Sequence, residues 1–257
     1  MEIEILNNKD NKLTFVIDGI NATLANTLRR LIITEVPTLA IDEVEFVKNN
    51  SALYDEIVAH RLGLVPIKTD LKSYNLKEEC KCKGKGCALC ELKLTLDKED
   101  GIVYSGDLKS TDPKATPVYS DMPIVELIKK QKVELEATAI LGQGKTHMKF
   151  SPGLCYYRGY PQFVVAKESS LKNIQEELQD VVTVKNDKIT INNLNNWNER
   201  YEEILEMNNV QVKNSEEKFI FNLESWGQLS CKEILLKALD IFNDKLDEFE
   251  SKLKKAK

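Results

Sequence analysis

Histidine is scarce in this sequence, and long apolar runs are missing. Only two histidines occur among 257 residues, His60 and His147, and they lie far apart in unrelated contexts. A catalytic site built on histidine is therefore poorly supported. No apolar run approaches the ~20 residues that span a bilayer, and the amino-terminal MEIEILNNKD lacks the features of a secretion signal. We therefore expect no membrane association and a cytoplasmic location.

An excess of positive charge is missing as well. The chain has 36 Lys and Arg against 41 Asp and Glu, a net charge of -5. Proteins whose main task is to hold nucleic-acid phosphates depend on clustered positive charge, so this class is disfavoured, as is direct sequence-specific reading of DNA. The carboxylates are scattered, and no acid/base pair stands out. The hydrophobic share of 42% and charged share of 30% are typical of a folded globular protein.

Cysteine is concentrated in one short loop, CKCKGKGCALC, with the spacing C-x-C-x4-C-x2-C. The four cysteines of this loop are Cys80, Cys82, Cys87 and Cys90. Four thiolates at this spacing can surround Zn²⁺ tetrahedrally, and Gly84 and Gly86 give the backbone the freedom for a tight turn. The alternatives are two disulfides, which rarely persist in a chain that is not secreted, or free thiols. Spacing and the expected compartment favour zinc over an iron–sulfur cluster. The site is expected to be structural, because a complete sulfur set leaves no open catalytic position.

Two further features carry weaker expectations. Cys155 and Cys231 stand alone and are predicted to be buried as small apolar residues. The segment GQGKTH, from Gly142 to His147, lacks the spacing of a phosphate-binding loop and is predicted to be a turn.

Two short helices are expected in the first quarter of the chain. Apolar residues recur at helical spacing after Asn21, a plausible N-cap, and Pro37 ends the run; they are Leu24, Leu28, Leu31 and Ile32. Arg29 and Arg30 lie beside this stripe, where arginines are often simply solvated. In DEIVAHRLGL the pattern predicts a second helix with an apolar stripe of Leu53, Ile57 and Leu62, a cap at Gly63 and an exposed His60 near its end.

Alternating apolar and polar residues predict strands in the segments 2–6, 13–17, 39–47, 92–96, 133–139 and 217–225. In the third of these, Val44 and Phe46 share one face. The stretch 165–215 is polar and rich in Asn, and we expect an inserted subdomain there. Strands together with separate helices indicate an α+β fold.

A final helix carries the most regular pattern in the chain. Its apolar residues are spaced alternately four and three residues apart, as in a heptad repeat. They are Leu235, Leu239, Phe242, Leu246, Phe249 and Leu253. We call these six residues the apolar seam. Ser230 and Glu233 form a capping-box pattern at the helix start. The seam can pack on the chain's own sheet or on another helix, and its length favours a helix of a partner chain.

Several segments resemble the family of archaeal RNA polymerase D subunits, the counterparts of the eukaryotic third-largest subunit and of the bacterial alpha amino-terminal domain. The main segment is INATLANTLRRLIITEVPTLAIDEVEFVKNNSALYDEIVAHRLGLVPI, from Ile20 to Ile67. The others are YSGDL from Tyr104, GQGKTHMKFSP from Gly142 and FIFNLESWG from Phe219. The resemblance covers nearly the whole chain.

The resemblance implies a discontinuous, alpha-like dimerisation domain at 1–48 and 216–257. It also implies an inserted β-rich domain with the cysteine loop at 49–164 and an inserted subdomain at 165–215. Some members carry iron–sulfur cysteines in this last region, but 165–215 has no cysteine here, so no iron–sulfur cluster is expected. Eukaryotic relatives have a zinc loop where Cys80 to Cys90 lie, and many archaeal members lack it, so the metal is not expected to be essential to the fold.

The resemblance further implies an assembly platform of DNA-directed RNA polymerase, without catalytic residues of its own. It would pair with a small alpha-like subunit, L, through the apolar seam, and then recruit the second-largest and largest subunits; other small subunits could also bind. Arg29, Arg30, His60 and Arg61 would face the second-largest subunit. From the residues alone, a zinc-knuckle module that binds nucleic acid through the lysines of the cysteine loop is the alternative, and metal-dependent hydrolysis is a weaker third reading.

Overall fold

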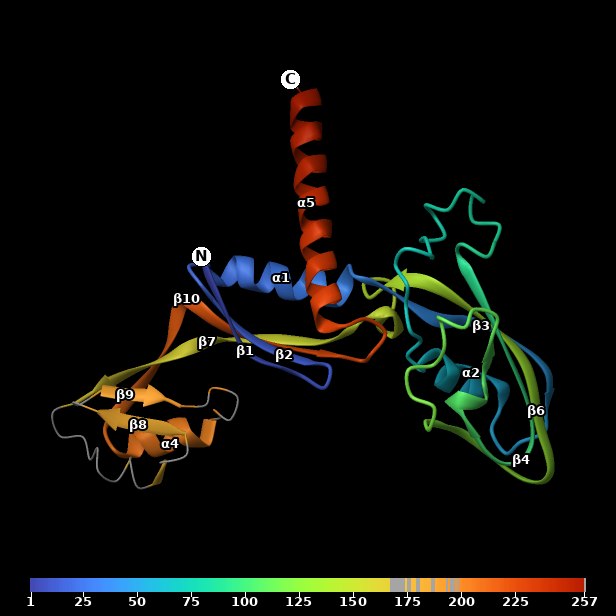
Figure 1. The fold of residues 1–257 in the computed structure, drawn as a ribbon, viewed down its shortest axis with the longest axis horizontal. Helices are drawn as coiled ribbons and strands as arrows, with labels where there is room; N and C mark the ends of the chain where they lie inside the picture. Colours follow the sequence, from blue (N-terminus) through green and yellow to red (C-terminus); the bar gives the residue numbers. More distant parts are fainter. Residues whose placement is uncertain are drawn as a thin grey trace. The chain divides into compact units, whose positions relative to one another are not determined.

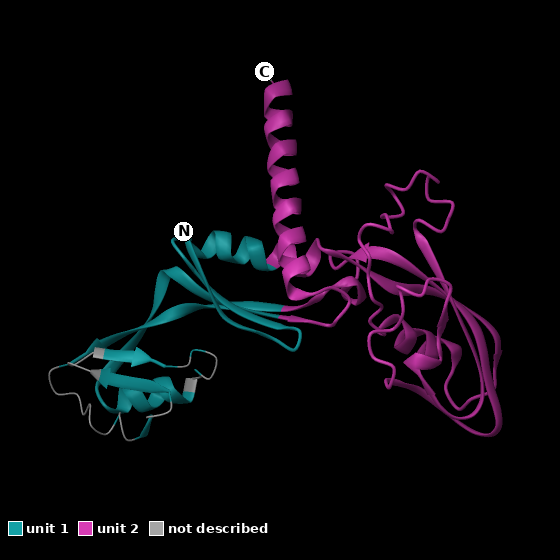
Figure 2. Ribbon diagram, in the orientation of Figure 1, with its two compact units in different colours: residues 1–29, 155–223 teal, residues 30–154, 224–257 magenta. Residues whose placement is uncertain are grey.

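The computed structural model describes residues 1–166, 174, 177–178, 181–185, 188–192, 194, 197 and 199–256. These residues form two compact units, each assembled from separate stretches of the chain (Figure 2). Unit 1 comprises Met1–Arg29 and Cys155–Leu223, and unit 2 comprises Arg30–Leu154 and Glu224–Lys257. Both units combine helices with antiparallel strands, which confirms the α+β class. None of the helices described is long and apolar enough to cross a membrane.

A four-stranded sheet with the order β1-β2-β10-β7 is the centre of unit 1 (Figure 1). Its strands are β1 (Glu2–Lys9), β2 (Lys12–Asp18), β10 (Val210–Ser225) and β7 (Gly153–Val165). The β1–β2 turn places Asp10 and Asn11 at φ 50° and 61°, a left-handed conformation that these residue types tolerate. Phe15 of β2 stacks on Phe221 of β10 with ring centroids 5.1 Å apart, so the sheet joins segments remote in sequence.

A second, smaller core of unit 1 falls within the predicted subdomain at 165–215. It contains β8 (Val182–Lys185), β9 (Lys188–Ile191) and α4 (Glu199–Met207). Trp197 is 4% exposed in this core, and its Nε1 donates to Glu202 Oε1 over 3.0 Å. The rest of the predicted subdomain, at 167–173, 175–176, 179–180, 186–187, 193, 195–196 and 198, lies outside the described residues.

Unit 2 is built on an antiparallel sheet with the order β3-β6-β4-β5. Its strands are β3 (Pro37–Asn49), β6 (Pro123–Gln143), β4 (Glu91–Tyr104) and β5 (Lys109–Ser110). Alternate residues of β4, such as Leu92 and Leu94, are at most 1% exposed, as the period of two predicts. Helix α2 (Asp55–Gly63) contributes Val58 and Leu62 to the same core.

Helices α1 (Ala22–Thr34) and α5 (Cys231–Lys255) begin as predicted. The Leu24 N–H donates to Asn21 Oδ1 over 2.9 Å, which confirms the N-cap of α1. At the start of α5, the Glu233 N–H donates to Ser230 Oγ and the Ser230 N–H donates to Glu233 Oε2, so the capping box is confirmed.

Around α2 the sequence-based prediction was partly wrong. The helix buries Val58 and Leu62, whereas Ile57 is 43% exposed, so the predicted stripe is displaced. Gly63 does not cap the helix: the C-cap is Leu64, in a right-handed conformation that any residue adopts. The turn predicted after Gly142 is confirmed at Gly144–Thr146, and Cys155 and Cys231 are buried as expected.

Candidate metal centre and partner surface

The sulfur atoms of the cysteine loop converge in unit 2. Cys80 Sγ lies 3.5 Å from Cys87 Sγ, Cys82 Sγ lies 3.6 Å from Cys90 Sγ, and all four sulfurs lie within 4.8 Å of one another. A tetrahedral zinc ion with Zn–S bonds of about 2.3 Å holds its sulfurs about 3.8 Å apart. The thiols therefore fit the dimensions of a Cys₄ zinc site, and none of these cysteines forms a disulfide.

Backbone turns bring the four thiols together. The Lys83 N–H donates to Cys80 O and the Cys90 N–H donates to Cys87 O, each over 2.9 Å, so each pair of cysteines closes its own turn. Gly86 has φ 87°, and a Cβ atom there would overlap the carboxylate of Glu91, which would have to move aside. Glu91 in turn pairs with Lys77 over 2.9 Å. The loop thus favours glycine at this point mainly for its left-handed conformation.

The pKa values of Cys82 and Cys90 are shifted in opposite directions. Burial raises the pKa of Cys90 to about 12. Burial also acts to raise the pKa of Cys82, but hydrogen bonds from the three neighbouring thiols outweigh it and lower this pKa to about 6. Ionisation is therefore favoured at Cys82 and disfavoured at Cys90. Ionisation of all four requires a cation at the centre, and a bound divalent metal would supply it.

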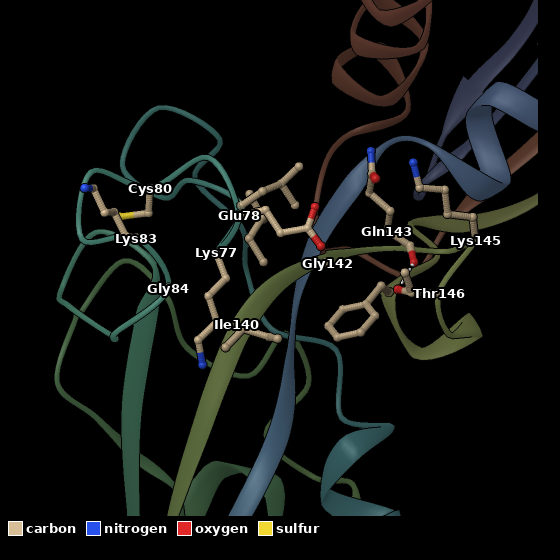
Figure 3. Close-up of a pocket in the computed structure, with 13 residues that line it drawn as sticks. Lys77, Glu78, Cys80, Lys83, Gly84, Ile140, Gly142, Gln143, Lys145 and Thr146 are labelled. Atoms are coloured by element: carbon tan, nitrogen blue, oxygen red, sulfur yellow. Dashed lines mark hydrogen bonds between the residues drawn. The ribbon is translucent and has the colours of Figure 1, made fainter.

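A groove of about 660 Å³ lies beside the cysteine loop (Figure 3). Lys83 and Gly84 line one wall and the end of β6 around Gly142 and Gln143 lines the other, with the side chain of Glu78 between them. Two of its three lysines are offset by carboxylates: Lys77 pairs with Glu91, and Lys145 lies 3.3 Å from Glu35. The third, Lys83, is exposed, so the groove as a whole carries mixed charge and is a poor match to a phosphate backbone.

Most of the apolar seam is exposed to solvent. Leu239, Leu246, Phe249 and Leu253 are 41%, 49%, 62% and 53% exposed, and every residue from Asn243 to Ala256 is exposed. The first turns of α5 are buried through Ile234 and Ala238, on a face that adjoins the seam. The helix is therefore attached at its start, while the seam residues further along it stay exposed. So much exposed apolar surface on one helix is typical of a partner interface.

The four residues predicted to face a large subunit lie on two helices. Arg29 of α1 is half-buried and donates from Nε and Nη2 to Asn26 Oδ1 at 3.1 and 3.0 Å, while Arg30 is exposed. On α2, His60 is exposed, and Arg61 donates from Nη1 to Ile124 O over 2.7 Å. Arg29 belongs to unit 1 and the other three to unit 2.

One candidate surface was missed by sequence reasoning. Leu64, Tyr119, Met148 and Trp226 come from four distant segments, yet they line one pocket of unit 2. Only Trp226 could have been noticed, as one of two tryptophans in the chain.

Comparison with known proteins gives consistent matches. A family model described as RNA polymerase Rpb3/Rpb11 dimerisation domain matches residues 14–246. The DNA-directed RNA polymerase subunit Rpo3 of Methanosphaera stadtmanae is 39% identical over 262 residues, covering 96% of both chains. The protein of the same name from Pyrococcus furiosus is 38% identical, covering 99% of this chain and 98% of the relative. That of Archaeoglobus fulgidus is 37% identical over 96% of both.

Proposed function

The chain belongs to the RNA polymerase Rpb3/Rpb11 family, and we propose that it is a non-catalytic assembly subunit of DNA-directed RNA polymerase. Its relatives are archaeal Rpo3 subunits, and we equate it with the subunit designated D. It works within the archaeal transcription machinery in the cytoplasm. Its contribution to nucleotidyl transfer is to hold the catalytic chains together.

The exposed apolar seam of α5 is the observation that carries this proposal. We assign it to a small alpha-like partner, subunit L, which would cover the seam with a helix of its own. Each large apolar side chain buried on association contributes about 1.5–3 kcal/mol, so a seam of six residues can support a stable heterodimer. The seam residues are Leu235, Leu239, Phe242, Leu246, Phe249 and Leu253.

The resemblance also supports a proposed functional division of the chain. We propose that 1–48 and 216–257 form the dimerisation domain, that 49–164 is an inserted β-rich domain, and that 165–215 is an inserted subdomain. The heterodimer then recruits the second-largest subunit through Arg29, Arg30, His60 and Arg61, and afterwards the largest. Exposed cations such as Arg30 suit this role, because complementary charge guides and orients association.

The cysteine loop is proposed to hold a structural zinc ion through Cys80, Cys82, Cys87 and Cys90. Bound there, the ion would fix the loop by joining its two turns. The support is the convergence of four sulfurs within 4.8 Å. With four protein ligands the ion would have no position for substrate, so the loop acts as a fastener and not as a reaction centre.

The test of the assembly role is copurification from the native host. The chain is tagged at its amino terminus, and the proteins that accompany it are identified and quantified by mass spectrometry. We expect a small alpha-like subunit and the two largest polymerase subunits in equal proportion. Recovery of the chain alone, or with nucleic acid only, would overturn the proposal.

A further inference from the structure

The four thiols of the cysteine loop are arranged as two close pairs. Cys80 Sγ lies 3.5 Å from Cys87 Sγ, and Cys82 Sγ lies 3.6 Å from Cys90 Sγ. Cys87 Sγ also lies 3.8 Å from Cys90 Sγ, but a bridge between these two would leave Cys80 to join Cys82 in a small, strained ring. Pairing Cys80 with Cys87 and Cys82 with Cys90 therefore uses every thiol of the loop at a short separation.

Each pair combines a buried sulfur with an accessible one. Cys80 and Cys90 are 5% and 0% exposed, whereas Cys82 and Cys87 are partly exposed. A small disulfide from solvent can therefore reach one member of each pair, while the other member lies next to it as a resolving thiol. Cysteines that exchange with disulfides have this arrangement, an accessible thiol beside a second thiol that displaces the reagent.

Positive charge surrounds the accessible sulfurs. The charged residues between Cys80 and Cys90 are all lysines, namely Lys81, Lys83 and Lys85. All three are exposed, and none of them forms an ion pair within the part of the chain that the structure describes. Unpaired cations favour thiolates nearby and attract anionic molecules. A small disulfide that carries carboxylates, such as oxidised glutathione, therefore suits this loop.

The backbone of the loop can follow its sulfur atoms as a pair closes. From Cys80 to Cys90 the chain forms only turns and bends, and strand β4 begins after them, at Glu91. Gly84 and Gly86 lie between the two members of both pairs and allow a wide range of backbone angles. No hydrogen bond between strands has to break when a bridge forms, so the change is confined to the loop.

We propose that the cysteine loop is a reversible thiol–disulfide site, in which an anionic small disulfide oxidises Cys82 with Cys90 and Cys87 with Cys80. In each pair the accessible sulfur attacks one sulfur of the reagent, which forms a mixed disulfide and releases one thiolate. The buried sulfur then attacks the protein sulfur of the mixed disulfide and releases the second thiolate. Each pair thereby gives two electrons to the reagent, and its two protons pass to the released thiolates.

The effect of this chemistry on the loop rests on the proposed zinc site and goes beyond it. Metal binding and bridge formation use the same sulfurs, so closing either pair removes two of the four zinc ligands and releases the ion. Cys80 and Cys82 belong to the first turn of the loop, and Cys87 and Cys90 belong to the second. Both bridges therefore join the same two turns as the metal would. Transient, redox-responsive bridges are the usual form of disulfides in reducing compartments.

Oxidised glutathione, added in excess to the purified full chain, tests the inference. A chromogenic chelator measures the zinc released, and tryptic mapping without reduction locates the bridges. We expect the zinc content to fall about fivefold or more, and a reducing agent with added zinc to restore it. The mapped product should join three peptides, EECK, CK and GCALCELK. Cys155 and Cys231, 2% and 5% exposed, should remain thiols. A bridge within GCALCELK would overturn the proposed pairing.

Two matched variants test the pairs separately. Cys90→Ser removes the buried partner of Cys82, so this chain should keep glutathione on Cys82 and still bridge Cys80 to Cys87. Cys80→Ser should give the reverse result, with glutathione on Cys87 and a bridge between Cys82 and Cys90. Intact mass spectrometry counts the glutathione on each chain, and the unchanged protein should retain none. Glutathione on all three remaining loop thiols of either variant would overturn the inference.

The zinc proposal and this inference can fail independently. If the chain purifies with zinc and keeps both its metal and its thiols in oxidised glutathione, this inference fails alone. If the purified chain binds no zinc and the two bridges form, the zinc proposal fails and the thiol–disulfide site stands.

Discussion

The ammonium group of Lys245, on α5, lies 2.9 Å from Glu35 Oε1, just beyond the end of α1. The other carboxylate oxygen of Glu35 lies 3.3 Å from Lys145, in the turn after β6. Glu35 is thus shared by two lysines, and its side chain is only 15% exposed. Beyond Lys245, α5 is exposed throughout to Ala256. This ion pair therefore marks where the anchored part of the helix ends.

Glu35→Gln should make stability less dependent on pH. Burial acts to raise the Glu35 pKa, but hydrogen bonds and charge from Lys245 and Lys145 outweigh it and hold the pKa below the ordinary 4.5. The stabilisation is thus present above pH 4.5 and is lost as the pH falls through the folded-state value. We expect the variant to lose about 0.5–1 kcal/mol at pH 7, because both lysines are half exposed.

Thermal unfolding of both proteins between pH 3 and 7 measures this effect. The two curves should converge at the acidic end. A constant difference across the range would show that the carboxylate charge is not responsible.

Leu246→Glu should abolish pairing with the small subunit and leave the chain folded. Leu246 is 49% exposed in the free chain, so the change removes little internal packing. In the heterodimer it would bury a charge in place of an apolar side chain, and we expect at least a hundredfold weaker association. Titration calorimetry with the purified small subunit measures this. Asp247→Ala, at an exposed position off the seam, is the control and should bind normally.

Arg30→Glu should separate the two steps of assembly. Arg30 is exposed, so folding and pairing with the small subunit should be unchanged, while retention of the second-largest subunit falls at least tenfold. Quantitative mass spectrometry of copurified chains gives both values at once. Lys48→Glu, an equal charge reversal at an exposed position of β3, should retain both partners. Loss of both partners from Arg30→Glu would point instead to damage within the chain.

Metal removal should loosen the cysteine loop and spare the sheet. The purified chain should contain one zinc ion, and Cys87→Ser should lower this occupancy because three sulfurs remain. Hydrogen exchange should accelerate in residues 78–91 but not in 133–141, since Val133 and Ala139 belong to a core independent of the thiols. Emission spectrometry for zinc and exchange mass spectrometry give the two readouts. Collapse of the β6 strand in the metal-free protein would contradict a purely local role.

Alanine substitutions at two glycines of the cysteine loop, Gly84 and Gly86, test how the loop conformation supports metal binding. Gly84 and Gly86 have similar φ values of 77° and 87°, so alanine at either strains the backbone by about 1 kcal/mol. At Gly84 a Cβ atom would meet only Lys77 O, 3.9 Å away, whereas at Gly86 it would collide with the Glu91 carboxylate. The carboxylate ends a flexible side chain that can move aside at the cost of its ion pair with Lys77, so Gly86→Ala should weaken zinc binding only about threefold more than Gly84→Ala in a competition titration. Equal effects would mean that backbone strain alone matters.

Features that depend on residues close together in the sequence were predicted correctly. The caps at Asn21 and Ser230 depend on residues within three positions of each other, and both were predicted correctly. The four cysteines likewise lie within eleven residues, so their convergence could be anticipated. Strand alternation at Leu92 and Leu94 was equally clear, because one face of β4 meets a core.

Features that depend on distant packing could not be derived. The face that α2 buries is chosen by the sheet beneath it, so Val58 turns inward while Ile57 stays exposed. The pocket that Trp226 lines needs four segments to meet, and none of them carries a pattern of its own. The proposed partner roles of Arg30 and His60 could not be derived either: each is a single exposed polar side chain, and only the family resemblance suggested a role for it.

The pairing of Phe15 with Phe221 has a consequence for biosynthesis. The two rings belong to strands separated by nearly the whole chain, and Thr14 hydrogen-bonds to Asn222, 208 positions later. The cysteine loop, by contrast, can close as soon as its own eleven residues leave the ribosome. The sheet of unit 1 must wait for β10, and the apolar seam of α5 is synthesised later still. On the proposed role of the seam, a nascent or prematurely terminated chain cannot engage the small subunit, and we expect only chains translated to the end of α5 to enter polymerase assembly.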